Sequence, residues 1–192
     1  MAADTDTSTT TSVTPLPMSL VLWVVNKYGQ VPRAAAHESN DPYPDPTGGG
    51  APESALRRLL GPLDLAELIT TADAVHPVFA ATSGAACADH LNRLTRAAGL
   101  APSWVADGRH VHQSWVGHRS QQRLLAASAV ALLDHLLSDP DAARLGTCQG
   151  ADCADAYVDQ SPAGCRQYCS LTCQNRARTR AYRAHRRAEQ RS

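Results

Sequence analysis

The sequence predicts an α+β protein of two unequal parts. We expect a mainly helical N-terminal domain with one strand and one β-hairpin, followed by a small cysteine-rich unit that ends in a basic helix. Leucines recur at helical spacing in two long stretches, residues 54–98 and 120–138. An Asp-Gly pair at 107–108 separates two β-prone segments. Five of the six cysteines lie between residues 148 and 173, and four of them form two close pairs.

The first residues predict a disordered tail over 1–17, because they are acidic and Thr-rich and carry no basic region before an apolar one. The apolar run at residues 20–25 is far too short to span a bilayer, so we expect no membrane attachment and a cytoplasmic protein. In a reducing compartment, clustered cysteines bind metal more often than they form disulfides.

Residues 19–26, "SLVLWVVN", are rich in Val, Leu and Trp and predict a buried strand. Residues 37–53 hold four prolines and three consecutive glycines, which predict a flexible loop. Two short helices are expected after Ser54, on leucine spacings that resume beyond Gly61-Pro62. A further helix should cover residues 87–98 and end at Gly99.

Asp107-Gly108 predicts a tight hairpin turn, because both residues tolerate positive φ angles. His110, His112 and His118 lie on or just after its second strand. These histidines either bind a metal or act in acid–base chemistry, or they simply lie on a solvated strand face. The absence of a nearby cysteine favours the solvated face. Residues 120–138 predict a helix of about five turns, with Leu125, Ala129, Leu132 and Leu136 on one side.

The clustered cysteines follow the pattern C-x4-C-x15-C-x3-C, formed by Cys148, Cys153, Cys169 and Cys173. Two close pairs about fifteen residues apart are typical of a tetrahedral zinc site. Zn²⁺ fits best because it accepts four sulfur ligands without redox chemistry. We therefore expect one structural zinc ion, which leaves no open position for catalysis.

The residues between the pairs predict a strand, a turn at 161–164 and a second strand. Ser170 is a good helix N-cap, which would place Cys173 in the first helical turn. One cysteine pair on a hairpin and a second pair at the start of a helix form a treble-clef arrangement. Cys87 and Cys165 are left over, and burial as small apolar residues is favoured for them over redox sensing.

The formal charge is split along the chain although it sums to zero. Residues 165–192 hold eight Arg and one Glu, net +7, whereas residues 1–164 hold ten basic and seventeen acidic residues, net −7. On a helix starting near Leu171, Arg176, Arg180, Arg183 and Arg187 form one stripe beside a stripe of alanines. The expected nucleic-acid contacts are Asn175, Arg176, Arg178, Arg180, Arg183, Arg186 and Arg187.

A solvated helix would normally mix Glu with its Arg, and here the only acid is Glu189. The pattern therefore favours duplex nucleic acid, contacted through its phosphates, over an acidic protein surface or a solvated tail. A further alternative is an intramolecular clasp between the basic segment and the acidic remainder of the chain.

The stretch "RLGTCQGADCADAYVDQSPAGCRQYCSLTCQNRARTRAYRAHRR" resembles the CGNR zinc finger. The matching positions are Asp159, Ser161, Arg166, Tyr168, Cys169, Ser170, Cys173, Asn175 and Arg176. Gln174 departs from the pattern, because it replaces the signature glycine. Upstream, "VLWVVN" with Asn26 at its end, "HLNRL" and the Asp-Gly hairpin resemble the ABATE domain that accompanies this finger. The family is regarded as stress-responsive transcription regulators.

This resemblance implies a sensing or interaction domain at 18–145, with a small-molecule effector, and a CGNR-type zinc finger at 146–190. We therefore expect a regulator that binds double-stranded DNA, not an enzyme. The alternative is a zinc-stapled interaction module that docks on an acidic protein partner. An enzyme that uses the hairpin histidines is a third, weaker alternative.

Overall fold

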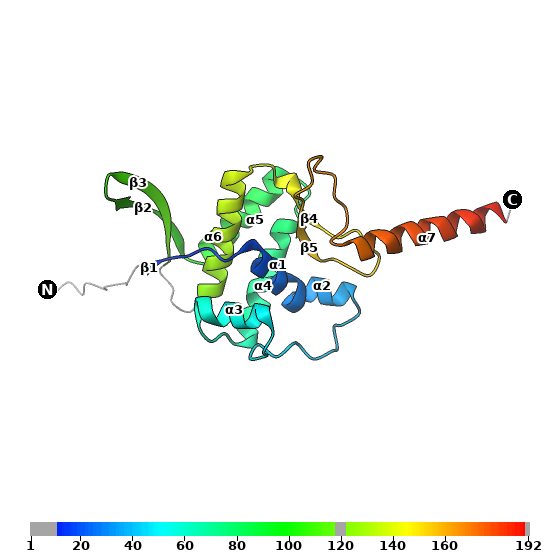
Figure 1. Ribbon diagram of the computed structural model, residues 1–192, viewed down its shortest axis with the longest axis horizontal. Coiled ribbons are helices and arrows are strands. Elements are labelled where there is room, and N and C mark those ends of the chain that lie inside the picture. Colours follow the sequence, from blue (N-terminus) through cyan, green and yellow to red (C-terminus); the bar gives the residue numbers. More distant parts are fainter. Residues whose placement is uncertain (1–10, 118–121, 191–192) are drawn as a thin grey trace.

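The computed structural model describes residues 11–117 and 122–190. The predicted α+β class is confirmed, with helices α1 to α7 and two small antiparallel sheets in this part of the chain. The body lies at the centre of an elongated molecule, from which a hairpin projects at one end and α7 at the other (Figure 1). The helices are α1 (Met18–Tyr28), α2 (Gln30–Ala35), α3 (Ala51–Leu60), α4 (Leu65–Phe79), α5 (Gly84–Ala97), α6 (Arg123–Ser138) and α7 (Leu171–Glu189), with a short 3₁₀ turn, η2 (Ala142–Arg144).

The predicted strand at 19–26 is wrong, because this segment forms helix α1. Its buried residues are spaced i, i+1, i+4, i+5 and i+8, which is one helical face: Leu20, Val21, Val24, Val25 and Tyr28. Burial of this face on the core outweighs the preference of valine for strands. A short apolar run rich in Val does not by itself separate the two conformations.

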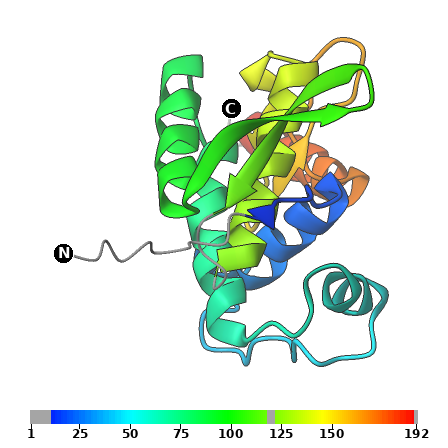
Figure 2. The same cartoon turned by 90° about the vertical axis from the view of Figure 1, so that its left-hand side faces the viewer.

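The core lies between α1, α4 and α6, and α5 packs beside them (Figures 1 and 2). Residues Leu124 to Leu132 of α6 are all buried, since helices surround most of its circumference. Helices α4 and α5 begin at side-chain caps, where Asp64 accepts from the Glu67 N–H and Ser83 from the Ala86 N–H. Gly99 follows α5 with φ of 63°, in agreement with the predicted helix end.

The tail was predicted to be disordered over residues 1–17. Residues 1–10 lie outside the described residues, and residues 11–17 contact the body. Strand β1 (Thr11–Ser12) pairs with β3, Leu16 is buried in the core, and the Leu16 N–H donates to the Ala127 carbonyl. The side chains of Val13 and Leu16 and a few backbone hydrogen bonds therefore hold residues 11–17, which composition alone did not indicate.

The predicted hairpin is present as β2 (Leu100–Asp107) and β3 (His110–Gly117), in the sheet order β1-β3-β2. Asp107 pairs with His110, so the two loop residues are Gly108, with φ of 58°, and Arg109. The outer part of the hairpin stands clear of the body (Figure 1), and Trp104 and Val111 are exposed on it.

The predicted loop at 37–53 is held in place by its own contacts, and α3 begins inside it at Ala51. The buried Arg33 guanidinium donates to the carbonyls of Glu38 and Asp41, and Arg57 donates to the carbonyl of Thr47. These bonds attach both halves of the loop to the helices that flank it.

The two-stranded sheet of the cysteine-rich unit packs against α1 and α4 of the body. Strand β4 (Leu145–Thr147) pairs with β5 (Ala156–Val158), and Leu145, Ala156 and Val158 belong to the hydrophobic core. The turn at 161–164 forms as predicted, with Gly164 at φ of 59°, but the predicted strand after it does not. The partner of β5 is instead β4, which precedes the first cysteine.

Candidate metal centre

The four predicted ligand cysteines converge at one point between the β4–β5 loop and the start of α7. The sulfur atoms of Cys148, Cys153, Cys169 and Cys173 all lie within 4.8 Å of one another. The Sγ of Cys169 is 3.6 Å from the Sγ of Cys153 and 3.6 Å from that of Cys173. A ZnS₄ tetrahedron with bonds of about 2.3 Å has S···S edges of about 3.8 Å. The geometry and the donor set therefore fit a single zinc ion.

The first cysteine pair is positioned by the loop between β4 and β5. Cys148 follows β4 directly, and its N–H donates to the Asp155 carbonyl, which extends the hairpin by one step. Gly150 turns the loop so that the Cys153 N–H donates back to its carbonyl. A Cβ added at Gly150 would lie 3.3 Å from Cys153 Cβ and 3.4 Å from Cys148 Sγ. The backbone therefore packs tightly behind these two ligands.

The second pair is positioned by the start of α7. Ser170 caps this helix as predicted, since its side chain accepts from the Cys173 N–H at 3.3 Å. Cys169 precedes the cap and Cys173 lies in the first turn, so both sulfurs sit beside the positive end of the helix dipole. A negatively charged zinc-thiolate group is favoured there.

The thiols differ in how readily they ionise. Burial raises the pKa of Cys153 to about 12 and also raises the pKa of Cys169. Burial acts on Cys173 as well, but hydrogen bonding with Ser170 and the neighbouring thiols outweighs it and lowers the pKa of Cys173. Zinc must therefore displace protons from at least two thiols at neutral pH, so that metal binding weakens as the pH falls.

A buried carboxylate organises the turn that leads to Cys169. Asp159 accepts from the Ser161 N–H at 2.8 Å and from the Arg166 N–H at 2.7 Å. Hydrogen bonding by Ser161 and by the Arg166 backbone holds the pKa of Asp159 below its usual range. The Arg166 guanidinium in turn donates to the carbonyls of Tyr168 and Cys169, and lies over the Tyr157 ring at 5.0 Å. Asp159 and Arg166 thus fix the backbone on which the second cysteine pair is mounted.

Residues 144–186 match the model of the CGNR zinc finger. The four cysteines within ligand distance form a candidate zinc site that is consistent with this finger. No curated protein matches the chain. Position 174, where the signature glycine is replaced, lies inside α7, and the Gln174 N–H donates to the Ser170 carbonyl in an ordinary helical turn. The fold of the zinc finger therefore places no demand for a glycine at this position.

The two remaining thiols and the described histidines of the hairpin are not part of the four-cysteine cluster. Cys87 is buried in α5 as predicted, and burial raises the pKa of its thiol. The predicted burial of Cys165 is wrong: this residue is exposed, because the segment after Gly164 does not form the expected strand. His110 and His112 are exposed on one face of the hairpin, as expected for a solvated strand, and His118 lies outside the described residues.

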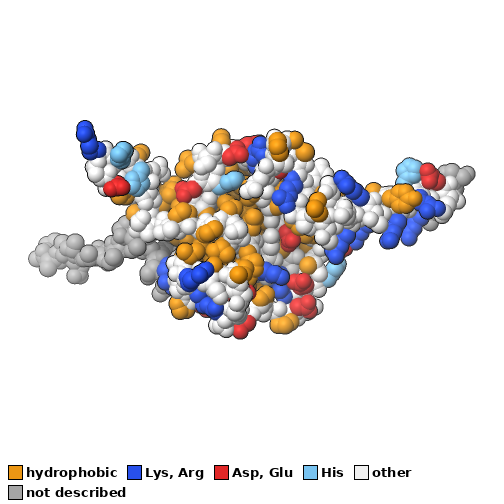
Figure 3. Space-filling view, in the orientation of Figure 1, with side chains coloured by type: hydrophobic (Ala, Val, Ile, Leu, Met, Phe, Trp, Pro, Cys, Tyr) orange, Lys and Arg blue, Asp and Glu red, His pale blue; other side chains and the backbone are white. Residues whose placement is uncertain are grey.

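The predicted nucleic-acid contacts all lie on α7, which extends away from the body (Figure 1). Basic side chains gather along this helix at the end of the molecule (Figure 3). None of the residues Leu171–Glu189 is buried. The structure does not bring all seven residues to one side, because Arg178 lies about 200° around the axis from Arg176, whereas Arg183 lies within about 20° of it.

One of the predicted nucleic-acid contacts has an intramolecular partner, in line with the alternative of a clasp between the basic and acidic parts of the chain. Arg180 Nη2 is 2.5 Å from Asp152 Oδ2, in the loop between Cys148 and Cys153, and His37 Nε2 is 3.8 Å from the other oxygen of Asp152. Both members of the Arg180–Asp152 pair are about half exposed, at 53% and 46%. The pair joins the third turn of α7 to the loop between Cys148 and Cys153.

Two residues of the helical body form hydrogen bonds with the segment that follows Cys153, and the sequence analysis did not predict these contacts. The Asn26 side chain accepts from the Ala156 N–H at 2.7 Å and donates to the Ala156 carbonyl at 3.1 Å, as a neighbouring strand would. His76 Nε2 lies 3.1 Å from the Ala154 carbonyl. Both bonds join residues more than seventy positions apart, and no local signal in the sequence announces such contacts.

In the part of the chain that the structure describes, no helix combines the length and the apolar character that crossing a membrane requires.

Proposed function

We propose that this protein is a DNA-binding transcriptional regulator, in which a structural zinc ion fixes the start of α7 and the arginines of that helix contact the phosphates of duplex DNA. We further propose that residues 18–145 form an ABATE-like unit that binds a small-molecule effector. Four thiolates would leave no open position on the zinc for water, so the metal centre supports a structural role and not catalysis.

The observation that carries the DNA proposal is a cationic helix in which none of the residues Leu171–Glu189 is buried. Arg176, Arg180, Arg183 and Arg187 lie on one face and are exposed. A lone helix in water is only marginally stable, and one with many arginines and a single acid repels itself. Phosphates would relieve this repulsion, and the arginine row spans about 16 Å, comparable to about five base-pair steps.

The Arg180–Asp152 pair is compatible with this role. Both side chains are about half exposed, and such pairs contribute only about 0–1 kcal/mol. A phosphate can therefore replace Asp152 as the partner of Arg180. The pair would meanwhile hold α7 in its direction before DNA binds.

Salt-dependent binding of duplex DNA tests the proposal, with the zinc-loaded full chain. Each phosphate contact that is lost should reduce the slope of log K against log salt by about one. We expect Arg183→Gln to reduce the slope by about one. Arg178→Gln removes the same charge from the opposite face and is the matched control, with a much smaller expected effect. Equal effects of the two variants would contradict a specific arginine face.

Failure to bind duplex DNA at modest salt would instead favour the second candidate, a zinc-stapled module whose basic helix docks on an acidic protein surface. The exposed Leu171 and Tyr182 on the side of α7 opposite the arginine stripe favour this candidate, because aromatic and apolar anchors are typical of protein interfaces.

A further inference from the structure

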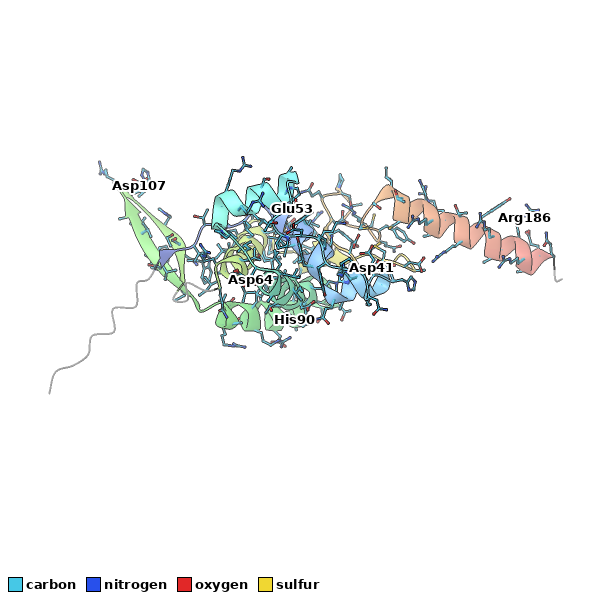
Figure 4. All side chains as sticks on the ribbon, turned by 90° about the horizontal axis from the view of Figure 1, so that it is seen from below. Asp41, Glu53, Asp64, His90, Asp107 and Arg186 are labelled. Carbon is cyan, nitrogen blue, oxygen red and sulfur yellow. The ribbon has the colours of Figure 1, made fainter. Side chains whose placement is uncertain are left out.

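The hairpin of β2 and β3 projects from the body at the end of the molecule opposite to α7. Figure 4 shows Asp107 at its tip, far from Arg186 on the basic helix. Strand β1 adds a third strand only at the base of the hairpin, where Thr11 pairs with Gly117. The outer part is therefore a two-stranded ribbon, which is at best marginally stable in water unless another surface packs on it.

The two faces of this hairpin differ in chemistry. Residues that pair across the strands lie on the same face, and successive residues along a strand alternate between faces. The register therefore places Trp104, Ala106 and Val111 on one side, which we call the apolar face. This face consists of Leu100, Pro102, Trp104, Ala106, Val111, Gln113, Trp115 and Gly117. None of these side chains is charged, whereas the opposite face holds Asp107 and both described histidines of the hairpin.

The outer half of the apolar face is open to solvent. Trp104 exposes 72% of its surface and Val111 exposes 65%. Pro102 and Ala106 are exposed as well, and Trp115, nearer the base, is half-buried. A tryptophan has up to about 250 Å² of surface, so that Trp104 alone leaves about 180 Å² in water and the whole face about 400 Å². An apolar patch of this size is typical of an interaction site.

The open edge of β2 is less suited to a partner than the apolar face. The Val13 N–H donates to the Trp115 carbonyl at 2.8 Å, so the backbone polar groups of Trp115 point toward β1. In an antiparallel ladder the residue opposite, Pro102, then points its own backbone groups away from β3, to the open edge. Proline has no N–H, and its place on an edge protects that edge against the addition of a further strand. We therefore expect a partner on the face.

The charges of the chain favour a second copy as this partner. Residues 100–117 carry one Asp and one Arg, and the whole chain has no net charge. Two hairpins can therefore meet without electrostatic repulsion. An acidic protein, a nucleic acid or an anionic lipid would find no cation on the apolar face. A face without charges is instead typical of the centre of homodimer interfaces, which are more apolar than other protein surfaces.

We propose that the apolar face is a homodimer interface, in which two hairpins pack face to face about a two-fold axis. Trp104 and Val111 of each copy are then buried against the other copy. The interface covers about 800 Å² in total, which is less than the standard size of stable interfaces, so that we expect a weak dimer with a dissociation constant of about 10–100 μM.

This inference goes beyond the proposed function and does not depend on it. In such a dimer each α7 stays at the outer end of its own copy, because the hairpin and α7 lie at opposite ends of the molecule (Figure 1). The dimer therefore presents two separate basic helices. A DNA duplex that bound both would raise the effective concentration of one copy near the other and strengthen the weak contact.

Sedimentation velocity of the zinc-loaded full chain, without DNA, tests the interface. The average sedimentation coefficient should rise from the monomer value toward the dimer value as the protein concentration increases from about 5 to about 500 μM. Because DNA is absent, a failure of dimerisation and a failure of DNA binding are observed separately.

Val111→Thr reduces the apolar surface of the proposed interface, and Val105→Thr makes the same change on the opposite face of the same hairpin. Both valines are exposed, so neither change disturbs the core. Each substitution is present in both copies, so that Val111→Thr should weaken dimerisation by about tenfold and Trp104→Thr by about a hundredfold. Val105→Thr is the matched control and should leave the dimer unchanged.

Two results would overturn the proposal in solution: a monomer at every concentration, or equal weakening of the dimer by Val111→Thr and Val105→Thr. A second arm mixes the protein with phosphatidylcholine vesicles. A monomer that sediments with these vesicles, and no longer does so as Trp104→Thr, would assign the apolar face to a lipid surface and refute the homodimer.

Discussion

Replacing Asn26 with leucine removes the side chain that joins α1 to β5 without opening a cavity. The N–H and carbonyl of the buried Ala156 then lose their partners at 2.7 and 3.1 Å. Each unsatisfied buried group costs about 1–3 kcal/mol, so that the free energy of unfolding should fall by about 2–4 kcal/mol if water reaches part of the site. For a chain of this size we expect a drop of about 5–15 °C in melting temperature.

The measurement is thermal and urea unfolding of the zinc-loaded protein, followed by circular dichroism, together with the rate of zinc transfer to a colorimetric chelator. Asn26→Leu should lower the stability and also speed the transfer of zinc, because β5 leads directly out of the loop that holds Cys148 and Cys153. Gln30→Ala is the matched control. It removes a hydrogen bond to Asp73 that is exposed, and should change both quantities little.

Two results would refute the reasoning. A stability loss below about 0.5 kcal/mol would mean that the Asn26 bonds contribute nothing net. Separate melting of the helical body and the zinc finger, with only the body affected, would mean that β5 does not transmit stability between them.

The remaining predictions concern the metal centre. Cys169→Ser should abolish stoichiometric zinc in elemental analysis, whereas Cys165→Ser should retain it; equal zinc contents would refute the ligand assignment. Gly150→Ala should bind zinc more weakly in a chelator competition, because its Cβ would press on two ligands; unchanged affinity would show that the loop yields. Because the pKa of Asp159 is lowered in the folded state, its ionised carboxylate stabilises the fold at pH values above the pKa of the unfolded state. This contribution to stability is lost as the pH falls through the pKa of the folded state. Asp159→Asn should therefore melt at a lower temperature at pH 7 and lose less stability on acidification, and a parallel pH profile would exclude this contribution.

The sequence predicted the features that local chemistry decides. The spacing of the cysteines, the cap at Ser170 and the turn at Asp107-Gly108 each depend on a few neighbouring residues, and each is found in the structure. The treble-clef arrangement and the DNA contacts remain predictions.

The errors lie where tertiary contacts decide. The segment at 19–26 forms a helix because its apolar face packs on α4 and α6, which begin only at Leu65 and Arg123. The Asn26–Ala156 bonds, the His76–Ala154 contact and the Arg180–Asp152 pair join distant residues. A single sequence carries no signal for such pairs.

Strand β5 connects the zinc ligands to the hydrophobic core, so that the stability of the protein in a cell should depend on zinc. Its residues Ala156 and Val158 fill the core, while the loop before it carries half of the ligand set. A chain that is short of zinc would therefore loosen throughout, and proteases act on loosened chains. We expect the steady-state amount of the protein to follow the zinc supply of its host, which a pulse-chase experiment under metal limitation would reveal.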